Sequence, residues 1–210
     1  MNTHLHGLYA ITNEQLMLEK DFFRKAEAAL SAGVAVLQYR DKSRDIKKRL
    51  SQASKLKLLC DTYDSILIIN DDIKLAQEVD ASGVHIGKND QSISEVRKTL
   101  GKNKIIGVSC YDQLTLAQDA SRQNADYIAF GSFFSSKVKP DAPKADLELI
   151  SSFKSDHSTP VCCIGGITTD NYSPLIKAGA DMLAIISDIF SHQSNEEIQN
   201  KCKAYSAAFK

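Results

Sequence analysis

Short apolar runs alternate with amphipathic segments along the whole chain. The amphipathic segments carry apolar residues at helical spacing, as in residues 21–32, where Phe22, Ala26 and Leu30 share one face before Gly33 ends the helix. Helices of this kind are expected after each apolar run. The pattern therefore predicts strands at residues 8–12, 34–39, 66–69, 83–86, 104–108, 126–130, 160–164 and 182–186.

The expected strands read as near-continuous apolar runs, which is typical of parallel strands covered by helices. Doubly wound open sheets also alternate strand and helix, but eight such units in 210 residues favour a closed barrel. No GxGxxG motif follows the first strand, which argues against dinucleotide binding. We expect an α/β fold in which residues 1–210 form a single (β/α)₈ TIM-barrel domain, with a tail at residues 1–7.

Composition excludes several classes of partner. The 26 Lys and Arg residues balance 26 Asp and Glu residues, so no global charge attracts nucleic acid or a membrane surface. The five cysteines show no CxxC spacing and fit reduced, buried thiols. No signal-peptide pattern and no apolar run of about 18 residues occur. We expect a cytoplasmic protein that acts on small molecules and binds neither nucleic acid nor membrane; self-association into a homo-oligomer stays open.

Two neighbouring strands end abruptly in carboxylates. The strand at residues 66–69 runs into Asp71, and the strand at residues 83–86 runs into a segment that ends at Asp90. If these strands are parallel neighbours, the helix between them brings both acids to one edge of the sheet. Either acid alone is more simply a solvated loop residue or a helix cap. As a pair, the two carboxylates repel each other unless a cation lies between them, which favours one Mg²⁺ ion that also carries a phosphate.

The active sites of (β/α)₈ barrels lie at the carboxyl ends of the strands. Cations, amides, hydroxyls and a glycine pair follow the expected strands: Gln38, Arg40, Lys42, Asn70, Ser109, Ser136, Lys139, Gly165, Gly166, Ile186 and Ser187. Lysine and arginine beside a carboxylate-bound Mg²⁺ form a receptor for pyrophosphate. The glycine pair and Ile186-Ser187 follow the last two strands, where barrels bind phosphate through backbone N–H groups. The mouth is expected to hold two phosphorylated groups.

Some of these residues also have a purely structural interpretation. Arg40 and Lys42 fit a charged loop, and the glycine pair fits a turn. His85 lies between apolar residues of a strand, which predicts a packed core histidine, and Cys110 is interpreted as structural because no histidine follows it. The loop at residues 131–145 holds two of the four prolines, and a loop of that length in a compact domain is commonly a lid or clamp.

Eight short motifs together resemble the thiamine-phosphate synthase family. In chain order they are YAIT (9–12), LQYRDK (37–42), IINDD (68–72), GVHIGKND (83–90), IIGVS (105–109), FGSFF (130–134), IGGIT (164–168) and IIS (185–187). The motifs occur in the family's order and on the expected strands. The resemblance implies a transferase that joins 4-amino-2-methyl-5-pyrimidinylmethyl diphosphate to a thiazole phosphate, releasing pyrophosphate and giving thiamine phosphate.

The resemblance also implies roles on the pyrimidine side. Positions matching Gln38, Arg40 and Lys42 hold the pyrimidine diphosphate in the family, and those matching Asn70 and Ser109 assist. The C–O bond to diphosphate breaks first, and the thiazole nitrogen captures the resulting pyrimidinylmethyl cation. Such a step needs no general base or nucleophile, which agrees with the apparent lack of a Ser-His-Asp or Cys-His set. It needs charge stabilisation on the diphosphate and exclusion of water.

Further implied roles concern the metal and the second substrate. Asp71 and Asp90 match the ligands of a single Mg²⁺ ion, and Lys139 matches a diphosphate-binding lysine in a mobile loop, so that Lys42, Lys139, Arg40 and Ser109 form the expected catalytic set. Positions around the thiazole phosphate or its ring match Ser136, Gly166, Ile186 and Ser187, and Val138 stands where the family usually has a threonine. Two further departures are Lys88 in place of a glutamine and Tyr111 in place of a histidine.

Other functions for such a barrel are open at this stage. A thiazole tautomerase shares the barrel but has no need of the Asp71–Asp90 pair or of Lys42, and Tyr111 argues against it. A non-catalytic barrel that binds thiamine phosphates has little use for a diphosphate clamp. A barrel acting on a sugar phosphate is not supported by the motifs on the second and third strands.

Overall fold

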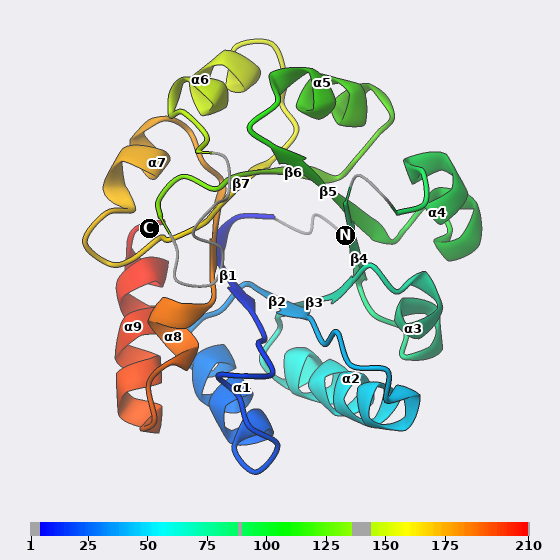
Figure 1. Ribbon diagram of the computed structural model, residues 1–210, viewed down its shortest axis with the longest axis vertical. Coiled ribbons are helices and arrows are strands. Elements are labelled where there is room, and N and C mark those ends of the chain that lie inside the picture. The colour runs from blue at the N-terminus through cyan, green and yellow to red at the C-terminus, as the bar shows by residue number, and fades with distance from the viewer. Residues whose placement is uncertain (1–4, 88–89, 136–143, 210) are drawn as a thin grey trace.

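The computed structural model describes residues 5–87, 90–135 and 144–209, and its eight parallel strands close into a barrel in the order β1 to β8 (Figure 1). The strands are β1 Gly7–Ile11, β2 Val36–Tyr39, β3 Ile66–Asn70, β4 Gly83–Ile86, β5 Ile105–Tyr111, β6 Tyr127–Phe130, β7 Val161–Ile164 and β8 Met182–Ile185. Closure comes from parallel pairing of β1 with β8, in which Gly7 lies opposite Met182. The predicted (β/α)₈ TIM barrel is confirmed.

Helices surround the barrel on the outside (Figure 1). They are α1 Phe22–Leu30, α2 Ile46–Thr62, α3 Ile73–Glu78, α4 Ile93–Leu100, α5 Leu114–Arg122, α6 Glu148–Lys154, α7 Ser173–Lys177, α8 Ser187–Phe190 and α9 Asn195–Ala207. Among the described residues, no helix is both long and apolar enough to cross a membrane.

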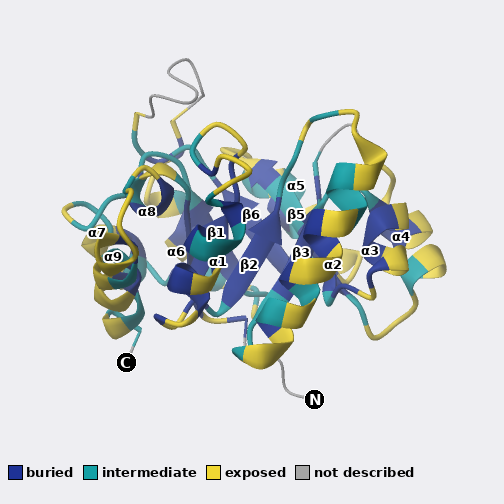
Figure 2. Ribbon diagram, turned by 90° about the horizontal axis from the view of Figure 1, so that it is seen from below, coloured by how far each residue is buried: buried dark blue, intermediate teal, exposed yellow. Residues whose placement is uncertain are grey.

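The core has two parts because successive residues of a strand point to opposite faces of the sheet. The larger part lies between the strands and the helices, where Leu8, Leu37 and Val84 pack outward. The smaller part fills the barrel interior with residues such as Tyr9, Val36, Ile68, Tyr127 and Met182. Figure 2 shows the buried strands enclosed by helices whose outer faces are exposed.

The predicted tail is wrong for residues 5–7. Leu5 is buried in the barrel interior, and Gly7 begins β1, where its N–H donates to the carbonyl of Asp181 at 2.9 Å. These residues are ordered because the barrel cannot close without a first strand beside β8. Residues 1–4 lie outside the described ranges.

Helical spacing alone would place Ile46 on the buried face of α2 with Ala53, Leu56 and Cys60. Those three residues are buried, but Ile46 is 75% exposed. The reason is local: Asp45 caps the helix by accepting a hydrogen bond from the N–H of Lys48, so Ile46 lies in the first turn, beyond the face that packs on the sheet.

All five cysteines in the chain are free and buried. Burial raises the pKa of the Cys110 thiol to about 12, which keeps it protonated and unreactive at neutral pH. The structural interpretation of Cys110 is therefore supported by its surroundings.

Candidate active site

Three charged side chains meet where β2, β3 and β4 end. Asp71 follows β3 with a left-handed backbone (φ 60°), and its N–H donates to the carbonyl of His85 on the neighbouring strand. The Oδ2 atom of Asp71 accepts a hydrogen bond from Lys42 Nζ at 2.5 Å. Asp90 Oδ2 accepts one from the N–H of Gly87 at 2.6 Å. The structure thus brings together the two acids and the lysine that the sequence singled out.

The pKa of Asp90 is raised above its ordinary value, chiefly by burial. The hydrogen bond from Gly87 lowers this pKa, and the negative charge of Asp71 raises it. The two carboxylates therefore lie close enough to interact. The candidate metal ligands, the carboxylate oxygens of Asp71 and Asp90, are hard donors. Among the described residues, no group of three or more His, Cys, Asp or Glu side chains forms a metal site, so the protein offers only two carboxylates here. Mg²⁺ is commonly bound by one or two carboxylates, with water and phosphate oxygens completing its shell. The Asp71–Asp90 pair fits that ion.

Helix α2 fixes the backbone on both sides of this cluster. Lys48 Nζ lies 2.8 Å from Asp41 Oδ2, and the N–H of Ser43 donates to Asp41 Oδ1 at 2.6 Å. Arg49 pairs with Asp72 at 2.6 Å, and Asp72 also caps α3. Asp41 lies between the two basic residues of the loop after β2, and Asp72 directly follows Asp71. Consecutive residues of α2 therefore hold both the basic loop and the first carboxylate in place.

A chain of hydrogen bonds crosses the barrel interior below the cluster. Gln38 Nε2 donates to the Tyr9 hydroxyl at 2.8 Å, which shares a hydrogen bond of 2.8 Å with the hydroxyl of Tyr127. The Tyr127 hydroxyl also bonds His85 Nδ1 at 2.9 Å, and His85 Nε2 bonds Ser109 Oγ at 2.8 Å. Gln38 on β2 and Ser109 on β5 are thus joined through Tyr9, Tyr127 and His85, which the sequence did not single out as site residues.

His85 is packed in the barrel interior, as predicted, but against polar groups: its ring stacks on that of Tyr127 with centroids 5.6 Å apart. Its ring lies inside the barrel, bonded at both nitrogens, and is partly exposed to the mouth. Strand parity is the signal that could have found it: His85 pairs in register with Asn70, so both side chains take the inner face. Burial lowers the pKa of His85 to about 4, which leaves the imidazole neutral at physiological pH.

His85 and Ser109 form a Ser-His pair, which is not a Ser-His-Asp set because the other ring nitrogen of His85 bonds the hydroxyl of Tyr127. A serine bonded to a histidine can form a nucleophile and base, provided that the histidine is basic and a carboxylate orients it. Here the pKa of His85 is about 4, and the group on its other nitrogen is the hydroxyl of Tyr127. The pair is therefore suited to orienting a bound group rather than to removing a proton from Ser109.

The glycine pair after β7 forms a tight backbone cradle. Gly165 and Gly166 have φ values of 108° and 61°, and a Cβ on Gly166 would lie 2.5 Å from the carbonyl oxygen of Ser135. Asn171 holds this loop from behind: its Nδ2 donates to the carbonyl of Gly166 at 3.0 Å, and its Oδ1 accepts from the N–H of Thr168 at 2.8 Å. Only glycine combines this backbone conformation with so close an approach.

One turn of helix, α8, begins at Ser187 directly after β8 and was not predicted. It places Ile186 and Ser187 beside the glycine loop at the same end of the barrel, since β7 and β8 are paired neighbours. Four residues discussed from the sequence, Lys88, Ser136, Val138 and Lys139, lie outside the described residues.

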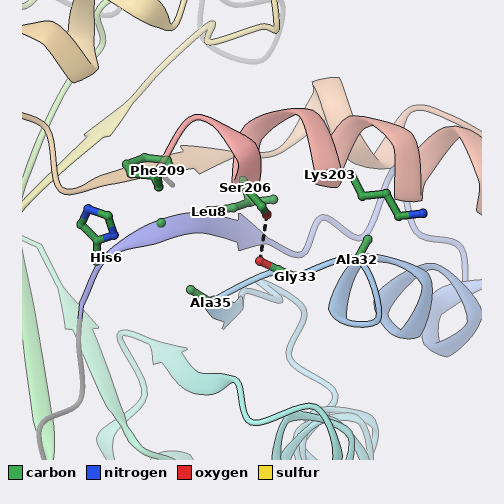
Figure 3. A pocket seen from close by; sticks show the side chains of 9 residues that line it. His6, Leu8, Ala32, Gly33, Ala35, Lys203, Ser206 and Phe209 are labelled. Carbon is green, nitrogen blue, oxygen red and sulfur yellow. Dashed lines mark hydrogen bonds between the residues drawn. The ribbon is translucent and has the colours of Figure 1, made fainter.

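A surface pocket of about 340 Å³ lies at the opposite end of the barrel (Figure 3). It is lined by His6 and Leu8 from the start of β1, by the turn before β2 around Gly33, and by Ser206 and Phe209 from the end of the chain. Ser206 Oγ donates to the carbonyl of Gly33 at 2.9 Å. This pocket holds none of the charged residues discussed above, and barrel enzymes use the other end.

The fold and this arrangement define a class of protein, a (β/α)₈ barrel whose polar and charged residues gather at the carboxyl ends of the strands, where barrel enzymes have their active sites. The comparisons with known proteins narrow that class. The sequence model described as thiamine monophosphate synthase matches residues 8–189. The chain therefore belongs to the thiamine monophosphate synthase family and is a homologue of thiamine-phosphate synthase, a transferase.

Individual relatives agree with that assignment. The thiamine-phosphate synthase of Thiobacillus denitrificans is 48% identical over 190 residues, covering 90% of both chains. The structure of thiamine phosphate pyrophosphorylase from Pyrococcus furiosus superposes with a TM-score of 0.87 at 29% identity, covering 99% of this chain and 96% of that one. The Bacteroides thetaiotaomicron thiamine phosphate pyrophosphorylase structure shares the fold, with a TM-score of 0.70 at 16% identity and 96% coverage of both chains.

Proposed function

We propose that this chain joins 4-amino-2-methyl-5-pyrimidinylmethyl diphosphate to a thiazole phosphate in a Mg²⁺-dependent reaction that gives thiamine phosphate and pyrophosphate. The observation that carries the proposal is the cluster of Lys42, Asp71 and Asp90 at the ends of three consecutive strands. A protein that binds only a monophosphate has no use for two interacting carboxylates beside a lysine. The names of the relatives, thiamine-phosphate synthase and thiamine phosphate pyrophosphorylase, support thiamine phosphate as the product, and the family resemblance of the motifs supplies the two substrates.

The leaving diphosphate is bound by the chain's own cations. Lys42 Nζ, which donates to Asp71 in the ligand-free chain and whose side chain is 52% exposed, can turn to a phosphate oxygen without leaving a buried partner unpaired. Arg40, whose N–H donates to Thr12 Oγ1 at 2.9 Å, presents its guanidinium from the same loop. Lys139, outside the described residues, is assigned to this group by resemblance. A magnesium ion on Asp71 and Asp90 would supply further charge neutralisation to the departing diphosphate.

The pyrimidine ring is positioned by neutral polar groups. Gln38, Asn70 and Ser109 lie at the ends of β2, β3 and β5, and the Tyr9–Tyr127–His85 chain fixes the orientation of the first and last of them. The C–O bond to diphosphate breaks with both electrons leaving on the diphosphate. The thiazole nitrogen then donates its lone pair to the pyrimidinylmethyl carbon. No proton needs to move in these two steps, which suits a neutral His85.

The thiazole phosphate binds at the neighbouring strand ends. Backbone N–H groups of Gly165 and Gly166, in their left-handed conformations, and those of Ile186 and Ser187 after β8 donate to phosphate oxygens. Ser136 and Val138, outside the described residues, belong to this side of the site by resemblance. The two phosphorylated groups thus occupy adjacent parts of one mouth, which brings the nitrogen nucleophile toward the pyrimidinylmethyl carbon.

The test is an assay of thiamine phosphate and pyrophosphate formation by the purified chain from the two substrates, with Mg²⁺ or with EDTA. We expect product with Mg²⁺, none with EDTA, and recovery when excess Mg²⁺ is added back. Equal rates in EDTA would contradict the metal requirement. Binding of both substrates without turnover would identify a non-catalytic barrel, and conversion of the thiazole alone would identify a tautomerase.

A further inference from the structure

Another ion pair, Lys201–Asp188, lies behind the phosphate side of the mouth. Asp188, the residue after Ser187, is on α8, and Lys201 is on α9, which lies beside α8 (Figure 1). Lys201 Nζ is 3.2 Å from Asp188 Oδ1 and 2.9 Å from the hydroxyl oxygen of Thr169. Thr169 belongs to the loop after β7 that also carries the glycine pair. The two charges therefore link the loop after β7, the helix after β8 and α9.

Every side-chain polar group of this cluster has a partner. Asp188 Oδ2 accepts from the hydroxyl of Tyr205 at 2.6 Å and from the N–H of Thr169 at 3.3 Å, while Oδ1 accepts from Lys201. The side chains of Asp188 and Lys201 are 16% and 28% exposed, so water screens the pair only in part. Four residues, Thr169, Asp188, Lys201 and Tyr205, make up what we call the Asp188 cluster.

A carboxylate next to a phosphate-binding backbone is electrostatically unfavourable unless its charge is neutralised. Asp188 is adjacent in sequence to Ser187, and its Oδ2 receives the N–H of Thr169, three residues after Gly166. A bare carboxylate there would repel a phosphate dianion. It is nevertheless well placed, because its hydrogen bond to Thr169 joins the two backbone segments that form the phosphate site. Lys201 removes the charge penalty while leaving that link intact.

We infer that Lys201 and Asp188 are positioning residues for the thiazole phosphate: Asp188 joins the two backbone segments that receive the phosphate, and Lys201 cancels its charge so that the anion can bind. This inference rests on the proposed function, since it adds a determinant of phosphate affinity to the same site. Neither side chain contacts substrate. If the pair only held α8 and α9 together, its net charge would not affect ligand binding. The inferred role instead predicts that the affinity for thiazole phosphate depends on the net charge of Asp188 and Lys201.

Charge-matched variants separate the two roles. Lys201→Met leaves Asp188 uncompensated, whereas Asp188→Asn with Lys201→Met removes both charges. Lys203→Met, an exposed lysine one position beyond Cys202 on the same helix, is the control. The binding of thiazole phosphate is measured by calorimetry without the pyrimidine substrate, and KM for each substrate and kcat are measured in the full assay. Thermal unfolding reports whether each variant is folded.

We expect Lys201→Met to weaken thiazole phosphate binding and to raise its KM by about tenfold, because an unpaired, partly buried charge is left beside the anion. KM for the pyrimidine diphosphate and kcat should stay within about twofold. The double variant should recover most of the lost affinity, and Lys203→Met should match the wild type. If Lys201→Met does not fold, Lys201→Gln removes the same charge and carries the test.

An unchanged thiazole phosphate affinity in Lys201→Met would overturn the inference, as would equal rises in both KM values or a double variant no better than the single one. The proposed function fails separately, if the wild type binds thiazole phosphate but forms no product. In that case calorimetry still decides the role of the pair. A wild type that does not bind thiazole phosphate would overturn both.

Discussion

Lys42 Nζ donates to Asp71 Oδ2 at 2.5 Å, so the basic loop after β2 and the first carboxylate after β3 form an ion pair across neighbouring strand ends. Both side chains are partly exposed, at 52% and 32%. Ion pairs with this much exposure contribute little to the free energy of unfolding. The pair is therefore better understood as part of the site than as a support of the fold, and its removal should affect turnover more than stability.

Replacing Asp71 with asparagine tests that separation. We expect Asp71→Asn to lower kcat by about 100-fold or more, because one of the two carboxylates that would hold Mg²⁺ is lost. The midpoint of thermal unfolding should hardly change, since asparagine adopts the left-handed backbone at this position with little strain. Steady-state kinetics over a range of Mg²⁺ concentrations, with thermal unfolding in parallel, gives both quantities.

The chain supplies a matched control for this substitution. Asp80 also has a left-handed backbone (φ 51°) and also pairs with a lysine, Lys104. It follows the C-terminal end of α3, whereas Asp71 precedes the N-terminal end of that helix. Asp80→Asn should leave kcat at the wild-type value. Asp71→Asn with normal kcat would mean that the metal is held elsewhere.

Stability should depend on pH through the buried carboxyl of Asp41. Burial opposes ionisation of this group, but hydrogen bonds from Lys48 and Ser43 outweigh it and lower its pKa from 3.8 to about 2. A lowered folded-state pKa stabilises the fold above the unfolded-state pKa, and this contribution is lost as pH falls from about 4 toward 2. We expect Asp41→Asn to cost about 1–3 kcal/mol at neutral pH and progressively less in acid. Urea unfolding at several pH values measures the difference.

The partner residue provides an internal check on the Asp41 prediction. Lys48→Met should show the same pH-dependent loss, and the double variant should lose little more than either single variant, because both changes remove one interaction. Additive losses at neutral pH would show that the Asp41–Lys48 pair is not coupled as the 2.8 Å contact indicates.

The hydroxyl of Tyr127 should matter for turnover although it lies below the mouth. Tyr127→Phe keeps the ring but removes the hydrogen bonds to Tyr9 and to His85 Nδ1, which frees His85 and with it Ser109. We expect kcat to fall about tenfold while KM for thiazole phosphate stays constant, because a loosened site loses its fixed geometry. The split between kcat and KM is the measurement.

Tyr39→Phe is the control for Tyr127→Phe. Tyr39 is also buried, and its hydroxyl bonds Gln52 Oε1 at 3.0 Å, but it points from β2 toward α2 rather than into the barrel. Both substitutions should cost about 1 kcal/mol of stability, as the loss of a buried hydrogen bond commonly does. If the two variants lose equal activity, the interior chain has no special role in orienting the substrate.

Strand and helix positions were largely predictable because parallel barrel strands are apolar and several of the helices, such as α1, α4 and α5, are strongly amphipathic. Strand β4 was predicted with its observed bounds. The same pattern failed for α8, because a single turn of four residues is too short to show a helical period.

Which face a strand residue takes was harder to predict. An apolar run on both sides of His85 looks the same whether the histidine points outward to the helices or inward to the mouth. Its inward direction follows from register with β3 and β5, which depends on the closed barrel and is not written in the local sequence. The same long-range pairing brings Asp71 and Asp90 together, and there the sequence sufficed because Asp71 directly follows β3 and Asp90 lies in the segment after β4.

The glycine loop after β7 permits a sharper test of the phosphate site. A Cβ on Gly166 would approach the carbonyl oxygens of Ser135 and Phe134 at 2.5 and 2.6 Å, so Gly166→Ala must displace the loop. We expect KM for thiazole phosphate to rise about tenfold or more, with KM for the pyrimidine diphosphate unchanged, because only the backbone donors of the phosphate site move.

Gly101→Ala is the matched control: Gly101 also has a positive φ (85°), at the end of α4, but a Cβ there meets nothing within 4 Å. Both variants place alanine at a positive φ, which costs on the order of 1–3 kcal/mol, so thermal unfolding should show a loss of stability in each. A rise in thiazole phosphate KM confined to Gly166→Ala would therefore arise from displacement of the loop rather than from lost stability, whereas equal kinetics in the two variants would place the phosphate elsewhere in the mouth.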